Sequence, residues 1–323
     1  MDEQRDLVVG GLSAAPGSRV TGMVEVDLGT ARVEVPLILV HGARPGPRVG
    51  VTAGIHGAEY VSIAALREVA LTLDPAELTG SLVACPVANP AAFAARTVYV
   101  DPLDGRNLNR VFPGDVTGSP TERLAAWLFR HVIGPAERFI DMHCGDMNEA
   151  LVSFAGVEET GDPEVDRVAV AMAEAYGLDY LVFGPTPGST TTAAAAAGIP
   201  AVLGEVGGQG RWPHADVALH AAGFRRALHA AGLLAEPRDG PRRPTRRLRR
   251  DVWLRSQASG CFHPAVAVGA TVRAGQRLGE VQDLFGRPLQ QVEAPLDGVV
   301  LFLVTSLAMN AGDPLLAIGE PEG

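Results

Sequence analysis

Two hydrophobic periods alternate along the first part of the chain. Near the start, β-rich runs separated by glycine or proline turns predict three strands, over residues 20–28, 33–42 and 47–54. Beyond them, helical periods alternate with short apolar runs. The predicted helices are 58–73, 121–133, 163–177 and 214–234, and the predicted strands are 80–89, 137–144 and 199–208, the last after an alanine-rich helix. This alternation is typical of an α/β fold, with a largely parallel or mixed sheet flanked by helices.

Two of the predicted helices carry end signals. Thr121 is placed to cap the N-terminus of the helix 121–133. Gly177 follows the last apolar position of the helix 163–177, as expected of a residue that ends a helix.

The pattern changes near residue 236. Residues 236–250 are rich in proline and arginine and predict a linker or an exposed edge. After residue 250, short apolar runs are punctuated by glycine without a long helical period, which indicates a small all-β domain. The sequence therefore predicts an α/β domain over residues 1–235, a linker over 236–250 and a β-domain over 251–323.

Composition narrows the class of protein. The chain has 323 residues, of which 47% are hydrophobic, so it can form one large core or two unequal ones. Its net charge of −10 argues against general binding to nucleic acid. Its apolar runs are too short to span a membrane, and the acidic start MDEQRD is unlike a signal peptide. The three distant cysteines, Cys85, Cys144 and Cys261, are expected to be reduced thiols, which predicts a cytoplasmic protein.

All 27 basic residues are arginines, because the sequence contains no lysine. This excludes chemistry that depends on a lysine amine: Schiff bases, the phosphate-binding lysine of P-loops, and carriage of lipoyl or biotinyl groups.

Histidine and glutamate side chains lie at the ends of three predicted strands. His56 and Glu59 follow the third strand, His143 comes near the end of a later one, and Glu205 lies in the last. Ligands of open α/β sheets bind at the carboxyl ends of strands. Two histidines and one carboxylate, with a fourth position left for water, are the ligand set of a catalytic zinc site. A His and a Glu three positions apart are common by chance, so the prediction depends on the convergence of all three strand ends.

Two further carboxylates have roles that stay open at this point. Glu205 is set among glycines, which favours a catalytic base in an open pocket over a structural carboxylate or a fourth ligand. Asp141 precedes His143 by two positions, and we place its side chain on the opposite face of the strand, away from the metal.

The loop 101–114 holds a second polar cluster, with Asn107, Asn109, Arg106 and Arg110 between glycine and proline turns. An arginine beside an asparagine can bind a carboxylate, because it offers a planar pair of donors next to an amide. The alternative is a turn-rich loop with solvated arginines.

The segments GIHGAEY, NLNRVFPG, DMH and GEVGG, in this order, resemble the succinylglutamate desuccinylase/aspartoacylase family, which is related to the zinc carboxypeptidases. The resemblance extends from about residue 17 to about residue 319. It implies one Zn²⁺ per chain in a zinc carboxypeptidase-like α/β domain, followed by a β-domain similar to biotinyl/lipoyl modules. The residues that match the family's functional positions are His56, Glu59 and His143 as zinc ligands, Glu205 as the catalytic glutamate, and Asn109 and Arg110 as the pair that binds the substrate's α-carboxylate.

The chain also departs from the family's pattern. Members supply an upstream arginine to the oxyanion, for which Arg96 is the candidate here; Tyr99 stands near the usual position, and Arg106 is an alternative. Members with acidic substrates tend to carry an arginine shortly before the GIP segment, where this chain has GSTTTAAAAAGIP. We therefore expect a substrate whose side chain or acyl group is not a carboxylate.

These observations predict zinc-dependent hydrolysis of the amide bond of an N-acyl amino acid or a related small N-acylated compound. One alternative is a metallocarboxypeptidase or another peptide-cleaving amidase, and another is a non-catalytic binding protein on a decayed enzyme scaffold. The expected partner is the small N-acylated substrate, with no nucleic acid and no membrane; a homo-oligomer is left open.

Overall fold

The computed structural model describes residues 4–235 and 245–322. Its largest element is a mixed sheet of 13 strands in that part of the chain. The helices are α1 (Tyr60–Thr72), α2 (Pro90–Ala95), α3 (Pro120–Leu128), α4 (Pro163–Tyr176), α5 (Thr190–Ala196) and α6 (His214–Ala230), with short helical turns η1 (Pro75–Glu77), η2 (Leu108–Arg110) and η3 (Phe129–Ile133). In this part of the chain, no helix is long and apolar enough to cross a membrane.

The N-terminal half of the sheet is built around three parallel strand pairs. These pairs join β6 (Thr79–Cys85) to β5 (Arg44–Ala53), β5 to β7 (Arg138–His143), and β7 to β11 (Ala201–Glu205). The remaining strands before the C-terminal part are β1 (Leu7–Val9), β2 (Leu12–Ala14), β3 (Ser18–Asp27), β4 (Arg32–His41), β8 (Glu149–Leu151), β9 (Phe154–Val157) and β10 (Tyr180–Phe183). Of these, β3 and β4 extend the sheet in antiparallel fashion beyond β6.

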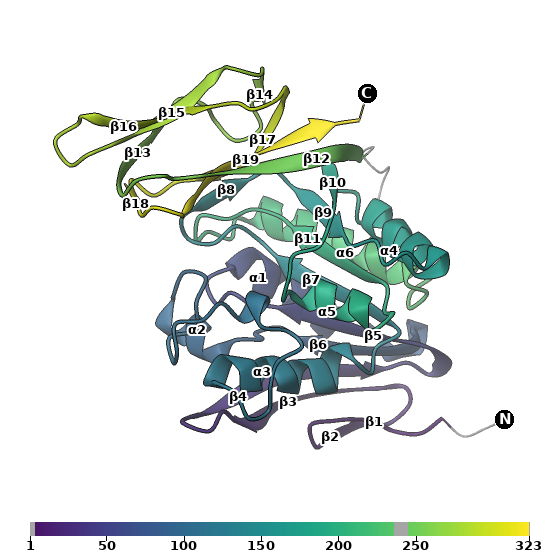
Figure 1. Cartoon of the computed structure of the whole chain (residues 1–323). Helices are drawn as coiled ribbons and strands as arrows, with labels where there is room; N and C mark the ends of the chain where they lie inside the picture. The colour runs from purple at the N-terminus through teal and green to yellow at the C-terminus, as the bar shows by residue number, and fades with distance from the viewer. Residues whose placement is uncertain (1–3, 236–244, 323) are drawn as a thin grey trace.

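Both faces of this sheet are buried. On β4, Ile38 and Val40 pack into one core and Leu37 and Leu39 into the other, because successive side chains of a strand point to opposite faces. The first core contains residues of α1, α4 and α6, and the second contains residues of α3, α5 and the β1–β2 hairpin. The predicted fold class, a mixed sheet flanked by helices, is therefore confirmed (Figure 1).

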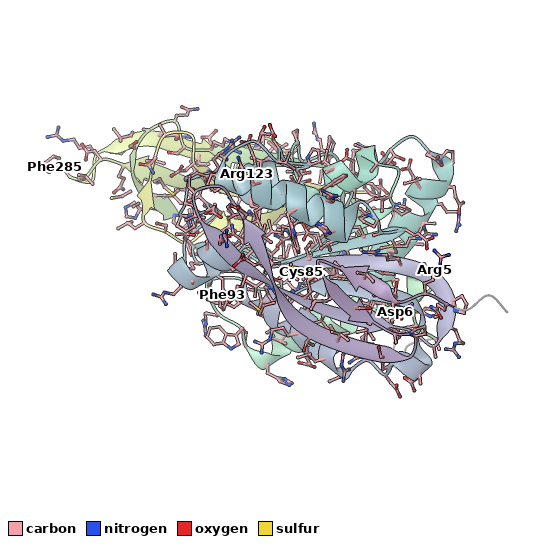
Figure 2. All side chains as sticks on the ribbon, turned by 90° about the horizontal axis from the view of Figure 1, so that it is seen from below. Arg5, Asp6, Cys85, Phe93, Arg123 and Phe285 are labelled. Atoms are coloured by element: carbon pink, nitrogen blue, oxygen red, sulfur yellow. The ribbon has the colours of Figure 1, made fainter. Side chains whose placement is uncertain are left out.

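The C-terminal part is all-β, as predicted, and continues the large sheet. Its strands are β12 (Arg246–Arg255), β13 (Gly260–Pro264), β14 (Thr271–Val272), β15 (Arg277–Gln282), β16 (Pro288–Glu293), β17 (Gly298–Val304), β18 (Ala308–Met309) and β19 (Pro314–Pro321). β12 pairs in parallel with β10, and β19, β17 and β14 follow it outward, while β16, β15, β13 and β18 form a separate sheet. This part has its own apolar core, and the turn between β15 and β16 carries the exposed Phe285 at one end of the molecule (Figure 2).

Two boundaries differ from the sequence prediction, and a third is as predicted. β12 begins at Arg246, so residues 246–250 of the predicted linker 236–250 belong to a strand, and residues 236–244 lie outside the described part. The helix predicted from Thr121 begins at Pro120 with Ser119 as N-cap, because the side chain of Glu122 accepts the backbone N–H of Ser119 in a capping box. The closing position of Gly177, in a left-handed conformation after α4, is confirmed.

Candidate metal centre and active site

The carboxyl ends of β5, β7 and β11 bring the predicted metal ligands together. His56 and Glu59 lie in the loop between β5 and α1, with Glu59 at the N-cap position of the helix. His143 is the last residue of β7, and Glu205 is the last residue of β11 and lies directly opposite it in the parallel pair. The strand order β5–β7–β11 thus gathers residues that are up to 149 positions apart in the sequence, from 56 to 205, at one edge of the sheet.

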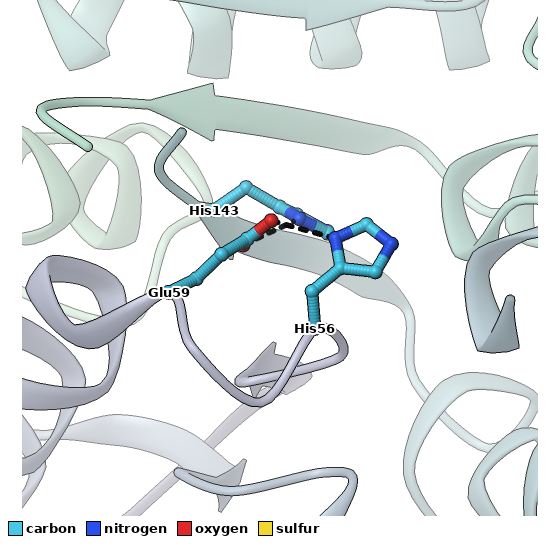
Figure 3. A group of neighbouring side chains, drawn as sticks. All are labelled: His56, Glu59 and His143. Carbon is cyan, nitrogen blue, oxygen red and sulfur yellow. Dashed lines mark hydrogen bonds and ion pairs between the residues drawn. The ribbon is translucent and has the colours of Figure 1, made fainter. Parts of the chain in front are cut away.

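The Glu59 carboxylate lies between the two imidazoles (Figure 3). Its Oε1 is 2.6 Å from His56 Nδ1, and its Oε2 is 2.9 Å from His143 Nδ1. One candidate ligand atom from each of the three residues lies within 4.8 Å of the other two, and all three side chains are largely buried. Atoms this close can bind one ion, so the three residues fit the zinc ligand set.

The outer nitrogen of each histidine has its own partner. His56 Nε2 is 3.1 Å from Asn107 Oδ1, and His143 Nε2 is 2.8 Å from Asp141 Oδ2. An amide oxygen and an ionised carboxylate can only accept a hydrogen bond. The Nε2 atom of each histidine therefore carries the proton and donates it. In the neutral ring, Nδ1 then presents its lone pair to the centre, which is the arrangement found around metal-binding histidines.

Asp141 connects the centre to two other elements. Its Oδ1 accepts the Thr52 hydroxyl at 2.6 Å, and its Oδ2 accepts the hydroxyl of Thr190 at the start of α5. The expectation that Asp141 points away from His143 is therefore wrong. Side chains two positions apart lie on the same face of a strand, and this rule could have found the contact from the sequence.

The charges at the centre favour an ionised glutamate. Burial alone would raise the pKa of Glu59, but the neighbouring His143 and His56 outweigh burial and lower this pKa to about 2. Burial likewise tends to lower the pKa of His143, yet Asp141 and Glu59 raise it well above the ordinary value, and Glu59 raises that of His56. The metal-free cluster therefore holds protons on its imidazoles that a bound cation would displace.

Glu205 is half-buried beside this cluster, with one carboxylate oxygen fully buried. Its Oε2 has no hydrogen-bond partner within residues 4–235 and 245–322. Burial raises the pKa of Glu205 well above its ordinary value, and the charge of Glu59 raises it further while His143 opposes the rise. A buried carboxylate oxygen without a partner is costly, so it indicates a group that acts on a molecule entering the site.

The predicted substrate-binding residues lie at different places around the centre. Asn109 is buried, and its Oδ1 accepts the backbone N–H of Thr190 at 3.0 Å. Arg110 donates to the carbonyl of Asn109 at 2.7 Å, and partial burial and the charge of Arg255 lower its pKa. Arg96 is exposed and ends α2 in a left-handed conformation, with φ of 55°.

The two other candidates of the loop 101–114 have separate contacts. Arg106 forms a surface ion pair with Glu122 at 2.8 Å, in the first turn of α3. Asn107 caps η2 by accepting the N–H of Asn109 at 2.8 Å, and its same oxygen faces His56. The Asn–Arg motif and the metal centre are therefore joined by direct contacts.

Tyr99, Asp146 and Glu149 form a group beside His56, and the sequence pointed only to Tyr99, near the usual position of the family's arginine. Tyr99 has φ of 61°, its ring meets the His56 ring edge-on at 6.5 Å between centroids, and its hydroxyl donates to Glu149 Oε1 at 2.7 Å. Asp146 accepts the backbone N–H of Tyr99 at 2.8 Å. Burial raises the pKa of Glu149 to about 7. Neither carboxylate stands at the end of a predicted strand, so the pattern that found Glu205 could not find them.

The C-terminal sheet reaches this same region. Glu149 begins β8, and β8 pairs in antiparallel fashion with β17. The contact between Thr305 N–H and the Asn148 carbonyl, at 2.7 Å, extends the same connection. The β-domain is thereby joined to the loop that carries Tyr99.

Known proteins resemble this chain over most of its length. Residues 45–231 match the succinylglutamate desuccinylase/aspartoacylase catalytic domain. The N-alpha-acetyl-L-2,4-diaminobutyric acid deacetylase of Halomonas elongata is 30% identical over 297 residues, which cover 89% of this chain and 86% of that protein.

Two solved structures are similar in fold. The product-bound ectoine utilization protein EutE (DoeB) of Ruegeria pomeroyi has a TM-score of 0.85 at 27% identity, with 94% of this chain and 95% of that chain covered. A succinylglutamate desuccinylase/aspartoacylase of Rhodobacter sphaeroides has a TM-score of 0.84 at 28% identity, with 94% and 96% covered. The catalytic-domain match covers more than half of this chain, and the similarity to the deacetylase covers 89% of it. This chain therefore belongs to the succinylglutamate desuccinylase/aspartoacylase family.

Proposed function

We propose that the protein is a zinc-dependent deacylase, which hydrolyses the amide bond of an N-acyl amino acid or a related small N-acylated compound. The observation that supports this most is that a cluster of metal-binding side chains and a separate free carboxylate oxygen lie at neighbouring strand ends. His56, Glu59 and His143 offer three converging ligand atoms, and Glu205 opposite His143 offers a buried carboxylate oxygen without a partner. Metal-assisted hydrolysis needs both parts: ligands that hold the ion, and a base that accepts a proton from the attacking water.

Each residue of the centre has a proposed role. His56, Glu59 and His143 hold one Zn²⁺, which when bound polarises a carbonyl and lowers the pKa of water. Glu205 takes a proton from the attacking water and returns it to the leaving nitrogen, for which its raised pKa suits it. Asn107 and Asp141 hold the two imidazoles in orientation.

The Asn–Arg motif positions the substrate in this proposal. The oxygen of the Asn109 amide already accepts the N–H of Thr190, so its NH₂ group is the end that donates to a substrate carboxylate, next to the Arg110 guanidinium. Arg96 is the proposed donor to the oxyanion. Its exposed position at the end of α2 requires the side chain to fold toward the centre when substrate binds.

The substrate is proposed to be non-acidic. The segment that forms α5 and its N-cap contains only serine, threonine and alanine, and Thr190 of this segment contacts both Asp141 and Asn109. The carboxylates near the centre include Glu149 and Asp146, which favour a cationic over an anionic side chain. An N-acetylated diamino acid, the substrate class named for the Halomonas relative, satisfies both conditions.

The chain's division and location are also part of the proposal. Residues 1–235 form the catalytic part, and the C-terminal β-domain covers the site through β8 and β17. The three cysteines are free thiols, which agrees with a reducing, cytoplasmic setting.

A substrate screen on metal-quantified protein tests the proposal. N-acetyl diamino acids, N-acetyl neutral amino acids, N-acetylaspartate, succinylglutamate and short peptides would be compared, with and without a chelator. We expect chelator-sensitive release of free amine from the non-acidic N-acetyl amino acids. Cleavage of peptides alone would favour the metallocarboxypeptidase alternative, and strict preference for N-acetylaspartate or succinylglutamate would contradict the proposed substrate class.

A further inference from the structure

A histidine and a tyrosine that take no part in the proposed chemistry are fully buried behind the metal centre. Tyr176 is the last residue of α4, and His220 lies in α6. The Tyr176 hydroxyl is 2.9 Å from His220 Nδ1, and His220 Nε2 is 3.0 Å from the backbone carbonyl oxygen of His143. The two side chains therefore form a chain of hydrogen bonds from two helices to the backbone of a proposed metal ligand.

The chemistry of the partners fixes the direction of these bonds. A carbonyl oxygen can only accept, so His220 Nε2 carries a proton and donates it. With that proton on Nε2, the Nδ1 of the neutral ring is an acceptor, and it accepts the Tyr176 hydroxyl. The tyrosine thus selects the tautomer that holds the His143 carbonyl.

The Tyr176 ring also contacts the strand that carries Glu205. A Cβ atom at Gly204 would lie 2.8 Å from Tyr176 Cζ, and one at Gly223 would lie 2.4 Å from Tyr176 Cδ1. Two glycines therefore admit the ring between β11 and α6, and Gly204 is directly followed by Glu205. Together the two side chains contact both strand ends. His220 contacts the backbone of His143, the proposed metal ligand, and the Tyr176 ring packs against Gly204, next to the proposed base Glu205.

The carbonyl of His143 has a second donor directly after β11, because the N–H of Val206 lies 3.3 Å from its oxygen. This bond connects the two strand ends directly, and the His220 bond holds the same oxygen from the helix side. Without His220, the last residue of β7 would keep only the longer of these two bonds at that oxygen.

We propose that Tyr176 and His220 are positioning residues, which hold the His143 backbone so that His143 Nδ1 meets the metal ion in a fixed geometry, beside Glu205. This rests on the proposed function, because it takes His143 as a metal ligand and Glu205 as the base. Neither side chain touches substrate or metal.

Three variants separate this role from general stability. His220→Asn removes the donor at the Nε2 position, whereas His220→Gln places an amide N–H close to it. Tyr176→Phe keeps the packed ring and removes only the hydroxyl that selects the tautomer. For each purified variant, zinc affinity is measured by chelator competition and the melting temperature of the metal-free protein is measured alongside.

We expect His220→Asn and Tyr176→Phe to lower zinc affinity by about tenfold or more, as loss of a partner behind a metal ligand commonly does. His220→Gln should restore the affinity to within about threefold of the wild type, and kcat on the best substrate of the screen should fall with the first two variants while KM changes little.

Two results would overturn the proposal. One is wild-type zinc affinity in both His220→Asn and Tyr176→Phe. The other is an equal loss of affinity in all three variants that follows the loss of melting temperature, because that would show a purely structural role. The wild-type protein is measured first. If it did not bind zinc, that result would refute the proposed function and not the positioning role.

Discussion

At the scale of single residues, the proposed chemistry depends on Glu205. Glutamine has nearly the shape of glutamate but cannot accept a proton. We predict that Glu205→Gln lowers kcat by about 10²- to 10⁴-fold, because general-base catalysis contributes about that much. Zinc content should stay at the wild-type value, since the three proposed ligands are untouched. The check is steady-state kinetics with metal analysis of the same sample, and activity close to that of the wild type would show that another group is the base.

The proton balance of the two histidines gives a second prediction at this scale. Asp141 and Glu59 outweigh burial and raise the pKa of His143, and Glu59 does the same for His56, so zinc must displace protons. Zinc affinity should therefore fall as the pH is lowered from about 8 to about 6, where these raised pKa values favour the imidazolium. Calorimetric titration in buffers of different ionisation enthalpy measures the protons released. Equal affinities at both pH values would contradict the assignment of the ligands.

The same scale shows what could be predicted from the sequence. The residues His56, Glu59, His143 and Glu205 were recognisable because each stands at a strand end, and the structure brings them together. The partners behind the centre were not recognisable in this way. His220 contacts a backbone atom 77 positions away, and such a contact depends on helix packing that no local pattern encodes.

At the scale of elements, the loop of the metal centre needs a close approach to α2. A Cβ atom at Gly57 would lie 2.1 Å from the backbone nitrogen of Phe93 and 2.2 Å from the carbonyl carbon of Ala92. We predict that Gly57→Ala forces the loop and α2 apart, costs about 1–3 kcal/mol of stability and lowers zinc affinity. Thermal melting and zinc titration measure both effects.

A matched control is Gly156→Ala in β9. There the nearest atoms belong to the flexible side chain of Leu203, at 3.3 Å. This variant should melt near the wild-type temperature and bind zinc normally. If the two variants behaved alike, the close approach at Gly57 would have no special role in the site.

Element types were easier to predict than their ends. Long periodic segments such as 163–177 were correct, and Gly177 ends α4 as its sequence indicates. The predicted linker extended too far, to residue 250. The first residues of β12 are mostly exposed arginines, so they lack the alternation of apolar and polar residues that marks a strand in the sequence. β8, which has only three residues, carries too short a pattern to be identified.

At the scale of the whole molecule, the C-terminal sheet and the catalytic part are one hydrogen-bonded structure. β12 pairs with β10, β17 pairs with β8, and Tyr180 and Val182 of β10 pack against the C-terminal core. We predict that a chain ending at residue 245 is insoluble or aggregated, because it exposes the edge of β10 and apolar side chains that were covered. Size-exclusion chromatography of the truncated protein tests this. A soluble monomer that binds zinc as the full chain does would show that the catalytic part is independent.

The central claim is that His56, Glu59 and His143 share one divalent ion beside Glu205. The most direct measurement is the titration of metal-free protein with zinc, for the wild type, His143→Ala and Glu205→Gln in parallel. The account predicts one tight site in the wild type and in Glu205→Gln, and loss of that site in His143→Ala. Zinc binding by His143→Ala as tight as that of the wild type, or no binding by the wild type, would contradict it.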